Sequence, residues 1–446
     1  LKKHIKHKMN ITNAKILFLD HHTCHANYAY YASPFRKKKC IIVVIDSMGD
    51  GINQTTWLVE NDKIQKIASS SQNDIARVYK MTTLILGMRP ELHEYKVMGL
   101  APYAKEKYFM ESYEALSKIS KIKNLRILYN KRPKDLFNYL LKSWQGHRFD
   151  NICGAVQFFT EKISKDLINN IYRKTKVKRY VLSGGIALNI KMNKTISELP
   201  YVKDFFVAGS GSDESLSIGA CYLVNKDYKK NKHIKNLYLG YDINDDLSKK
   251  NLNKLSKKYK IYRNIRPKKI AQLLKNGEII ARVNYKSEFG ARALGNRSIL
   301  ASPYTEGIVD KINKAIKNRD FWMPFALSIL KEKQNFCIVN KKKLSSPFMT
   351  VGFNVNRKNY KYLKNGCHPY DKTVRPQIVD KKICADFHKI ISEFYKLTKV
   401  PALLNTSFNL HGNPIVHDLK DAIKTFENCD LRFLLVNNVL IKKKDI

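Results

Sequence analysis

The stretch Ile41-Ile42-Val43-Val44-Ile45-Asp46-Ser47-Met48-Gly49-Asp50-Gly51 predicts the centre of an α/β fold. Its first five residues are apolar and β-branched, as in a buried strand, and Asp46 ends the run. The glycines and acids that follow are typical of a tight turn, and residues 55–59 have the composition of a returning strand. The sequence therefore predicts a hairpin whose first strand ends in an acid. Such a hairpin either faces a metal or phosphate or is simply a hairpin.

Upstream of this hairpin lies a cluster of imidazoles, His21-His22-Thr23-Cys24-His25. If a helix begins there, His21 and His25 stand at positions i and i+4 and share one face. Two neutral imidazoles suit zinc, iron, nickel or copper. A carboxylate as third ligand, with positions left open, suits Fe(II) or a catalytic zinc. Such histidine pairs also occur on helices that bind nothing, so the pair alone leaves both interpretations open.

A glycine turn lies further along the chain. Residues 180–183 have the composition of a strand, which runs into Gly184-Gly185 and then into a helix that opens near Asn189. In a turn of this kind, backbone N–H groups can approach phosphate or ribose. Because many α/β proteins turn at Gly-Gly, the pattern by itself is a weak indication of nucleotide binding.

The first half of the chain ends with another strand-to-helix junction. Residues 205–208 predict a short strand, and Asp213 lies between it and the next apolar segment. An acid there either faces a metal or caps the helix, and position alone favours the cap. Residues 225–235 are rich in lysine and predict an interdomain linker, after which helices and strands alternate again.

Length and composition limit the class of protein. A chain of 446 residues with 44% hydrophobic residues predicts two domains with sizeable cores. It contains no apolar run long enough for a membrane span and no signal-peptide pattern. Its eight cysteines are scattered without a Cys-x-x-Cys pair, which argues against a zinc ribbon or a disulfide framework. We therefore expect a cytoplasmic protein.

The formal net charge is +44, from 82 basic and 38 acidic residues. Such a charge can indicate nucleic acid or an anionic membrane as partner. Here the lysines are spread along the whole chain beside many Asn and Ile residues, so each short run is best interpreted as a solvated face. Anionic small ligands such as nucleotides and phosphates fit the charge equally well, and we do not expect nucleic acid as the main partner.

The chain also carries longer sequence blocks, in this order: Asp20-His21-His22-x-x-His25-Ala26; Glu94-Tyr95-Lys96-Val97-Met98-Gly99-Leu100-Ala101-Pro102-Tyr103; Ser183-Gly184-Gly185-Ile186-Ala187-Leu188-Asn189; Phe289-Gly290-Ala291-Arg292-Ala293-Leu294-Gly295-Asn296-Arg297-Ser298-Ile299-Leu300; Val374-Arg375-Pro376-Gln377; and Leu404-Asn405-Thr406-Ser407-Phe408-Asn409. Together they span the chain from about residue 16 to its end. The chain resembles the O-carbamoyltransferases of the NodU/CmcH class.

The resemblance implies an α/β fold in two domains. Residues 1–230 would form an actin-like, metal-binding domain similar to the tRNA threonylcarbamoyl transferase, which passes a carbamoyl group to a hydroxyl. Residues 236–446 would form a YrdC-like domain that makes carbamoyl-adenylate from ATP and carbamoyl phosphate. Relative to the family we expect a truncated actin-like domain whose opening strands are missing. A sheet without those strands would expose edges and apolar faces.

The resemblance also implies roles for individual residues. The metal, Fe(II) or another divalent transition metal, would be held by His21, His25 and Asp213. The catalytic residues would be Asp46, Arg292 and Lys317, and Mg would accompany ATP. Guanidinium groups suit phosphate oxygens because they bond bidentately. The nucleotide- and phosphate-binding set would be Gly184, Gly185, Asn189, Asn296, Arg297, Arg319, Arg375, Asn405 and Ser407.

The function expected from this resemblance is ATP- and carbamoyl phosphate-dependent O-carbamoylation of a sugar, a glycan or a secondary metabolite. Two alternatives come from other classes. One is a truncated, non-catalytic remnant that keeps only nucleotide binding. The other is a tRNA- or RNA-associated protein, which the basic charge favours and the order of the sequence blocks disfavours. The acceptor and the oligomeric state are left open by the sequence.

Overall fold

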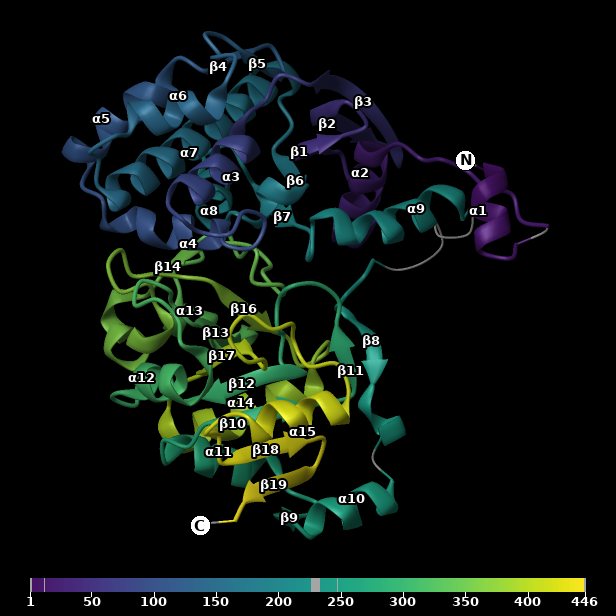
Figure 1. Ribbon diagram of the computed structural model, residues 1–446, viewed down its shortest axis with the longest axis vertical. Helices are drawn as coiled ribbons and strands as arrows, with labels where there is room; N and C mark the ends of the chain where they lie inside the picture. The colour runs from purple at the N-terminus through teal and green to yellow at the C-terminus, as the bar shows by residue number, and fades with distance from the viewer. Residues whose placement is uncertain (1, 12, 226–232, 247, 445–446) are drawn as a thin grey trace.

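The computed structural model describes residues 2–11, 13–225, 233–246 and 248–444. They form two α/β bodies, one above the other in Figure 1, and the chain passes from the upper body to the lower one after residue 225. Most of the predicted linker, residues 225–235, lies outside the described residues. Among the described helices, none combines the length and apolarity that a membrane span needs.

The upper body is built on a five-stranded sheet in the order β3-β2-β1-β6-β7. The central strand β1 (Cys40–Gly49) pairs antiparallel with β2 (Ile52–Glu60), which pairs antiparallel with β3 (Lys63–Ser70). On its other side β1 runs parallel to β6 (Arg179–Ser183), which runs parallel to β7 (Asp204–Val207). The predicted hairpin is confirmed, and its first strand is the middle of the sheet.

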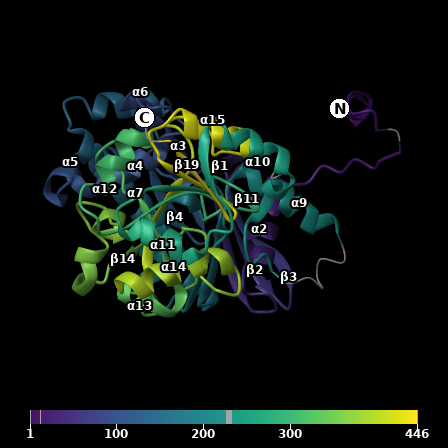
Figure 2. The same ribbon diagram turned by 90° about the horizontal axis from the view of Figure 1, so that it is seen from below.

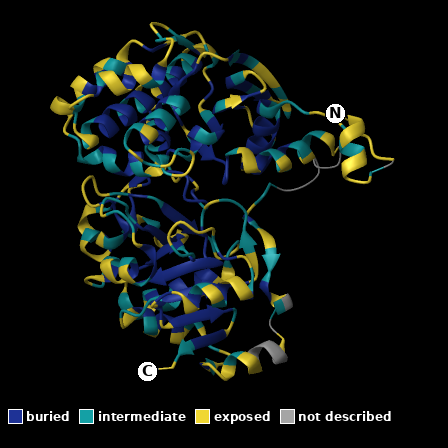
Figure 3. Ribbon diagram, in the orientation of Figure 1, coloured by how far each residue is buried: buried dark blue, intermediate teal, exposed yellow. Residues whose placement is uncertain are grey.

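Helices cover both faces of this sheet. One face carries α2 (His21–Ala32) and α9 (Leu216–Val224), which pack against each other, and the other carries α3 (Ile75–Ile85), α7 (Phe149–Thr175) and α8 (Ile190–Glu198). Further elements surround α7, namely α4 (Glu94–Leu100), α5 (Glu106–Ser117), α6 (Leu136–Ser143) and the hairpin of β4 (Ser120–Lys123) and β5 (Arg126–Tyr129). The helix α1 (Lys2–Lys8) lies apart from the body and buries no residue (Figures 1 and 3).

Alternate residues of β1 face two different cores. Ile42 and Val44 pack with the buried tyrosines of α2, whereas Ile41, Val43 and Ile45 pack with α3 and α7. Residues 40–46 are buried throughout, so the apolar faces of this strand are covered within the described chain. This two-sided burial explains why the strand reads as a continuous apolar run with no polar alternation.

The lower body is a mixed eight-stranded sheet in the order β16-β13-β17-β12-β10-β18-β19-β9. The pairs β10–β18 and β13–β16 are parallel, and the other neighbours are antiparallel. The strands are β9 (Tyr259–Tyr262), β10 (Ile280–Val283), β12 (Arg297–Ala301), β13 (Ala326–Leu330), β16 (Pro376–Val379), β17 (Ala402–Ser407), β18 (Phe433–Val436) and β19 (Val439–Lys443).

Helices and two short ribbons complete this body (Figures 1 and 2). The helices are α10 (Lys249–Ser256), α11 (Pro267–Lys275), α12 (Ile308–Ile312), α13 (Gln334–Cys337), α14 (Ala385–Thr398) and α15 (Leu419–Glu427). The ribbons pair β8 (Tyr238–Asp242) with β11 (Lys286–Glu288), and β14 (Phe353–Asn354) with β15 (Thr373–Val374). The structure is thus mixed α/β in both bodies, as the sequence predicts.

Direct contacts hold the two bodies together. The Asn193 amide on α8 donates to the carbonyl oxygen of Thr350 at 2.8 Å. The Lys342 ammonium of the lower body donates to three carbonyl oxygens at and beyond the end of α8, at 2.6–2.8 Å, those of Ser197, Leu199 and Val202. A cation placed at the carboxyl end of a helix satisfies carbonyl groups that have no partner within the helix. The bodies are therefore docked by polar contacts to main-chain atoms.

Candidate functional site

The two histidines of the first sequence block lie on the first two turns of α2. The Asp20 carboxylate caps this helix by accepting from the backbone N–H of Thr23 at 2.7 Å. The carboxylate of Asp50, in the turn after β1, accepts from the backbone N–H of His21 at 2.8 Å. Two carboxylates thus fix the first turn of α2. On this helix the i, i+4 spacing places His21 and His25 on one face, as the sequence predicts.

Four side chains converge at the end of β1. The Nε2 atom of His25 lies 3.2 Å from Asp46 Oδ2 and 3.5 Å from Asp213 Oδ1. The Nε2 atom of His21 lies 3.5 Å and 3.6 Å from the same two oxygens. All four ligand atoms lie within 4.8 Å of one another. The site lies at the carboxyl ends of the parallel strands, where open α/β sheets place their ligands. We call His21, His25, Asp46 and Asp213 the His/Asp cluster.

The position of Asp213 decides between the two interpretations given to it. Asp213 is the first residue of the helical turn Asp213–Ser215, whose N-cap position is Ser212, and α9 begins after Ser215, so Asp213 caps neither element. Its carboxylate instead faces both histidines and remains 65% exposed, whereas the His25 side chain is fully buried. The cap interpretation is wrong. The site is closed on the side of α2 and open on the side of Asp213.

The His/Asp cluster fits a divalent transition metal. Within the described residues, the buried atoms His21 Nε2, His25 Nε2 and Asp46 Oδ2 have no hydrogen-bond partner, although buried polar atoms nearly always have one. Two ligands about 2.1 Å from a tetrahedral ion lie about 3.4 Å apart, close to the separations found here. Burial alone would raise the pKa of Asp46, but the two imidazoles outweigh it and hold that pKa well below its usual range.

Glycines give the His/Asp cluster its room. A Cβ atom on Gly49 would overlap the ring of His21, so this position of the strand has no room for a side chain. In the glycine turn, Gly184 has φ +88° and passes so close to a carbonyl oxygen of β1 that a Cβ would overlap it. A Cβ on Gly185 would lie 3.2 Å from Asp46 Oδ1. The Gly184-Gly185 turn therefore lies beside the cluster, whereas sequence reasoning missed Gly49.

Asn189, predicted to contact a nucleotide, is engaged within the fold. Its side-chain oxygen caps α8 by accepting from the backbone N–H of Met192 at 3.0 Å, and it also accepts from the Gln157 amide at 3.2 Å. Its amide nitrogen donates to the Tyr79 hydroxyl and to Gln157, both at 3.0 Å. These contacts use the amide fully.

The third imidazole of the sequence block, His22, serves the fold. It is fully buried, and its Nε2 atom lies 3.1 Å from the carbonyl oxygen of Ile52. Its Nδ1 atom lies 3.2 Å from the Thr55 hydroxyl. These two contacts anchor α2 to β2 and occupy both ring nitrogens of His22.

The lower body contains a group of cations that we call the arginine cluster, formed by Arg292, Arg319 and Arg375. Burial lowers the pKa of each, and the neighbouring guanidinium groups lower the pKa of Arg375 further. The pKa of Arg319 falls to about 10. Within the described residues, no carboxylate pairs with any of the three, and Arg292 and Arg375 make no hydrogen bond. Unpaired cations held side by side favour a ligand with several negative charges.

Lys317 lies two residues before Arg319 in the chain, and both side chains reach the end of β17, where Ser407 lies. Lys317 ends a π-helical turn and is buried, and its ammonium donates to Ser407 Oγ at 3.1 Å and to Asn409 Oδ1 at 2.6 Å. Arg319 donates to the Thr406 hydroxyl at 3.0 Å. Burial, the larger cause, and the neighbouring Arg319 lower the pKa of Lys317 well below its usual value. The structure therefore brings three predicted residues, Lys317, Arg319 and Ser407, to the end of β17.

Arg297 and Asn296, which are expected to bind nucleotide or phosphate, make contacts within the fold. Arg297 is fully buried at the start of β12 and donates from all three guanidinium nitrogens to backbone carbonyls at 3.0–3.3 Å, those of Tyr241, Asn284, Tyr285, Asn296 and His417. The Asn296 amide donates to the carbonyl of Lys286 at 2.9 Å and its oxygen accepts from Arg282 at 3.1 Å. All three guanidinium nitrogens of Arg297 are thus engaged within the fold, whereas the Asn296 amide uses one of its two N–H groups.

Replacing Arg297 with methionine is expected to lower the free energy of unfolding by about 3 kcal/mol, because several buried carbonyls lose their donor. Chemical denaturation followed by circular dichroism measures the change. The matched control is Arg126→Met, since Arg126 is exposed on β5 and should be neutral. An Arg297→Met protein as stable as the wild type would show that the buried guanidinium is not structural.

Asn405 supports the loop that carries Arg292. Its side chain is buried at the centre of β17, and its amide donates to the carbonyl of Ala293 at 3.2 Å and to the Ser328 hydroxyl at 2.9 Å. Its oxygen has no partner among the described residues. Asn405 therefore holds the loop behind Arg292, with one buried acceptor still free.

The two clusters are joined by a close contact between loops. A Cβ atom on Gly290 would overlap the Ser210 hydroxyl, so the backbone at Gly290 lies directly against the Ser210 side chain. Gly290 lies two residues before Arg292 of the arginine cluster, and Ser210 lies three residues before Asp213 of the His/Asp cluster. The loops that carry one residue of each cluster therefore meet at the boundary between the two bodies.

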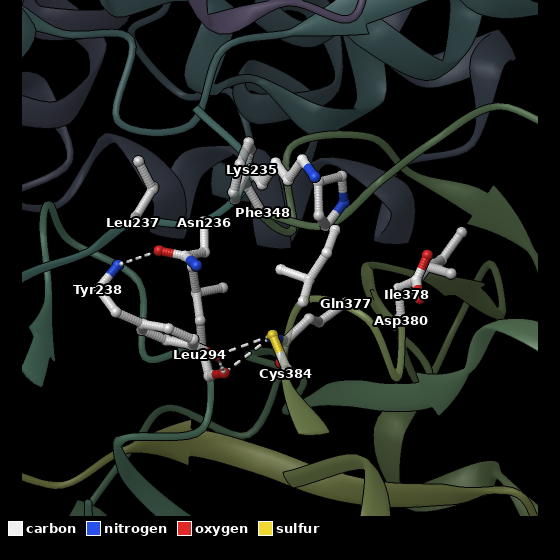
Figure 4. Close-up of a pocket in the computed structure, with 12 residues that line it drawn as sticks. Lys235, Asn236, Leu237, Tyr238, Leu294, Phe348, Gln377, Ile378, Asp380 and Cys384 are labelled. Carbon is white, nitrogen blue, oxygen red and sulfur yellow. Dashed lines mark hydrogen bonds between the residues drawn. The ribbon is translucent and has the colours of Figure 1, made fainter. Parts of the chain in front are cut away.

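A small cavity beside this boundary is too small for a substrate. It encloses about 10 Å³, which is at most the space of one water molecule. Figure 4 shows the Tyr238 hydroxyl pointing to Cys384, with the oxygen and sulfur 3.1 Å apart, and Tyr238 also donates to the carbonyl of Leu294 at 2.9 Å. We assign this cavity to the packing of β8 against the lower body.

Two family models match separate parts of the chain. Residues 2–222 match the family model described as Carbamoyltransferase N-terminus, and residues 271–443 match the model described as Carbamoyltransferase C-terminus. The first range holds the His/Asp cluster and the second holds the arginine cluster. Each cluster therefore lies within a matched family region.

Relatives match along most of the chain. The uncharacterized protein MJ1051 of Methanocaldococcus jannaschii is 34% identical over 99% of this chain and 86% of its own length. The nodulation protein NolNO of Sinorhizobium fredii is 30% identical over 97% of this chain and 64% of its own length. The 3'-hydroxymethylcephem-O-carbamoyltransferase of Amycolatopsis lactamdurans is 24% identical over 59% of this chain, and the match spans about half of that enzyme, 49%.

Proposed function

This chain belongs to the carbamoyltransferase family of the NodU/CmcH class, and from that membership we propose that it carbamoylates a hydroxyl of a sugar, a glycan or a secondary metabolite. The carbamoyl group would come from carbamoyl-adenylate, made from ATP and carbamoyl phosphate. The observation that carries the proposal is the pair of clusters. Unpaired cations suit phosphates, and the His/Asp set suits a metal. A loop that carries one residue of the first cluster contacts a loop that carries one residue of the second.

The first step is assigned to a YrdC-like domain within residues 236–446. The arginine cluster would bind the phosphate groups of carbamoyl phosphate and ATP, because each guanidinium offers a planar fork of donors to phosphate oxygens. Lys317 would hold Ser407 and Asn409 in place beside it. Bound anions also relieve the mutual repulsion of the three cations, so binding is favoured in this domain. Water would first release phosphate from carbamoyl phosphate to leave carbamate, and a carbamate oxygen would then displace pyrophosphate from the α-phosphate of ATP to give carbamoyl-adenylate.

The second step is assigned to an actin-like domain within residues 1–230, and the strand order of its sheet supports that fold. His21, His25 and Asp213 would hold a divalent transition metal, with Asp46 as a fourth ligand. When bound, such an ion supplies Lewis acidity toward the carbamoyl carbonyl. The Gly184-Gly185 turn beside Asp46 would admit the adenylate, and the open side at Asp213 would admit the acceptor hydroxyl. AMP would be the leaving group.

Formation of AMP from ATP and carbamoyl phosphate tests the proposal. The purified chain is expected to release AMP only when both substrates and an acceptor are present, and only after loading with Fe(II) or another divalent transition metal. Chromatography of the nucleotides measures it, with omission of carbamoyl phosphate as the control. If ATP binds but no carbamoyl phosphate-dependent AMP forms with any metal, the non-catalytic nucleotide-binding alternative replaces the proposal.

A further inference from the structure

The loop between β11 and β12 carries Arg292, and it is folded around a single carboxylate. Glu288 ends β11, and its Oε1 atom accepts from three backbone N–H groups at the far end of this loop, those of Leu294 at 2.6 Å, Asn296 at 2.7 Å and Arg297 at 3.2 Å. Backbone N–H groups that converge in this way form a concavity that binds an anion. Here the anion is a side chain from the start of the same loop.

The Glu288 carboxylate serves this loop and no cation. Its second oxygen, Oε2, is buried and has no hydrogen-bond partner among the described residues, and no described lysine, arginine or histidine forms an ion pair with it. Burial raises the pKa of Glu288, and the three N–H groups oppose that shift because they stabilise the charged form. The charged carboxylate and the closed conformation of the loop therefore stabilise each other.

Side chains of the sheet hold the same loop from behind. The Asn405 amide on β17 donates to the carbonyl oxygen of Ala293 at 3.2 Å, and the Gln377 amide on β16 donates to that of Leu294 at 2.7 Å. These contacts fix the two residues that follow Arg292 against β16 and β17. The backbone is thus bound on one side by a carboxylate and on the other by amides of the sheet.

Glycines allow the loop to pack closely before and after Arg292. Gly290 has φ +98° and lies against the Ser210 side chain, and Gly295 has φ +117° and lies against the Phe387 ring, so a Cβ atom at either position would overlap its neighbour. Arg292 lies between these two points, and its guanidinium makes no hydrogen bond with any described residue. The loop therefore has a closely held backbone and one cationic side chain that the fold does not use.

We propose that Glu288 is a positioning residue of the anion site, because its carboxylate holds the loop in the conformation that presents Arg292 to the phosphate groups of the substrate. The inference rests on the proposed function and adds to it the residue that preorganises the site. Glu288 acts through Arg292 and does not touch the ligand. Such a restraint is needed because like charges repel, so a mobile loop would carry Arg292 away from the other two guanidinium groups before the substrate binds.

A double-mutant cycle with titration calorimetry of the full chain and inorganic pyrophosphate tests the inference. Glu288→Gln keeps an oxygen that can accept from the loop but loses the charge, and it is expected to bind pyrophosphate about tenfold more weakly than the wild type. In the Arg292→Gln background the same change is expected to cause no further loss, because the side chain that Glu288 positions is gone. Glu306→Gln is the matched control, since Glu306 is exposed on the same body and should leave the affinity unchanged.

Amide hydrogen exchange gives a second measurement that needs no ligand. The peptide that contains residues 294–297 is expected to exchange faster in Glu288→Gln than in the wild type, because its N–H groups lose charge-assisted hydrogen bonds. The same peptide should exchange at the wild-type rate in Arg292→Gln. An unchanged rate in Glu288→Gln would show that the carboxylate does not hold the loop.

The outcomes separate this inference from the proposed function. If the wild-type chain binds no pyrophosphate, the anion site itself is wrong and the proposed function fails with it. If the wild type binds and Glu288→Gln binds equally well, only the inference is overturned. An equal loss with and without Arg292 also overturns it, because a carboxylate that merely supports the fold acts in both backgrounds. A loss that occurs only when Arg292 is present supports the positioning role.

Discussion

Replacing His25 with alanine is expected to lower the affinity for a divalent transition metal by more than about 100-fold and to abolish carbamoyl transfer. Even outer-shell contacts cost metal sites 10- to 100-fold, and loss of a ligand costs at least the upper end of that range. His25 is fully buried, with both ring nitrogens unpartnered among the described residues and Nε2 3.2 Å from Asp46. Metal titration with measurement of the bound stoichiometry checks the affinity.

The control for this experiment lies on the same helix. His22→Asn removes a neighbouring imidazole whose two nitrogens contact Thr55 and Ile52, while its ring lies 5.5 Å from the ring of His21. It should lower stability and leave the metal stoichiometry at the wild-type value. Pyrophosphate binding at the arginine cluster should be unchanged in His25→Ala. Full metal occupancy in His25→Ala would contradict the assignment of the cluster as a metal site.

Replacing Arg375 with glutamine is expected to weaken pyrophosphate binding about 100-fold and to stop AMP formation. Two hydrogen bonds from one guanidinium to a phosphate, each charge-assisted, account for a loss of this size. The variant should be no less stable than the wild type. The pKa of Arg375 is lowered well below its usual value, first by burial and then by Arg292 and Arg319, so its charged form is disfavoured in the folded protein. Removing that charge removes the unfavourable burial and repulsion from the folded state.

The substitution of Arg375 is therefore expected to lower the affinity for pyrophosphate without lowering the stability of the fold. This combination is typical of a binding residue whose charge is unfavourable in the unliganded protein. Calorimetry with pyrophosphate and thermal unfolding measure the two quantities on the same sample. Arg357→Gln is the matched control, because Arg357 is exposed on the same body and should change neither. An Arg375→Gln protein that loses stability and keeps its affinity would place this arginine in the fold and remove it from the site.

The apolar run at the start of the hairpin was enough to predict the centre of the first sheet. Burial on both faces leaves a continuous β-branched stretch, and residues 40–46 are buried on both sides. The histidine pair was predictable for a related reason, because helical spacing alone puts His21 and His25 on one face. In both cases the information is local in the chain.

Other parts of the site depend on contacts that are distant in sequence. Position alone favours a helix cap for Asp213, and only the family resemblance makes it a metal ligand; in the structure its carboxylate faces residues from α2, about 190 positions away in the chain. Arg297 lies in a highly specific sequence block, yet its guanidinium donates its hydrogen bonds to backbone carbonyls from three separate segments. A motif marks both ligand-binding and structural residues, and only the surrounding acceptors tell them apart.

The docking of the two bodies was also beyond sequence reasoning. Lys342 occurs in a lysine run that was interpreted as a solvated face, yet its ammonium binds three carbonyl oxygens beyond α8. His368 belongs to none of the recognised blocks and still fixes α4 through Gly99. Both contacts depend on where the partner carbonyls lie in space, and periodicity carries no information on that.

The most direct test of the account is exchange of labelled pyrophosphate into ATP by the full chain. Carbamoyl-adenylate formation is reversible, so the account predicts exchange that requires carbamoyl phosphate, survives His25→Ala and disappears in Arg375→Gln. Exchange without carbamoyl phosphate, or its absence in a chain that binds both pyrophosphate and ATP, would contradict formation of carbamoyl-adenylate at the arginine cluster.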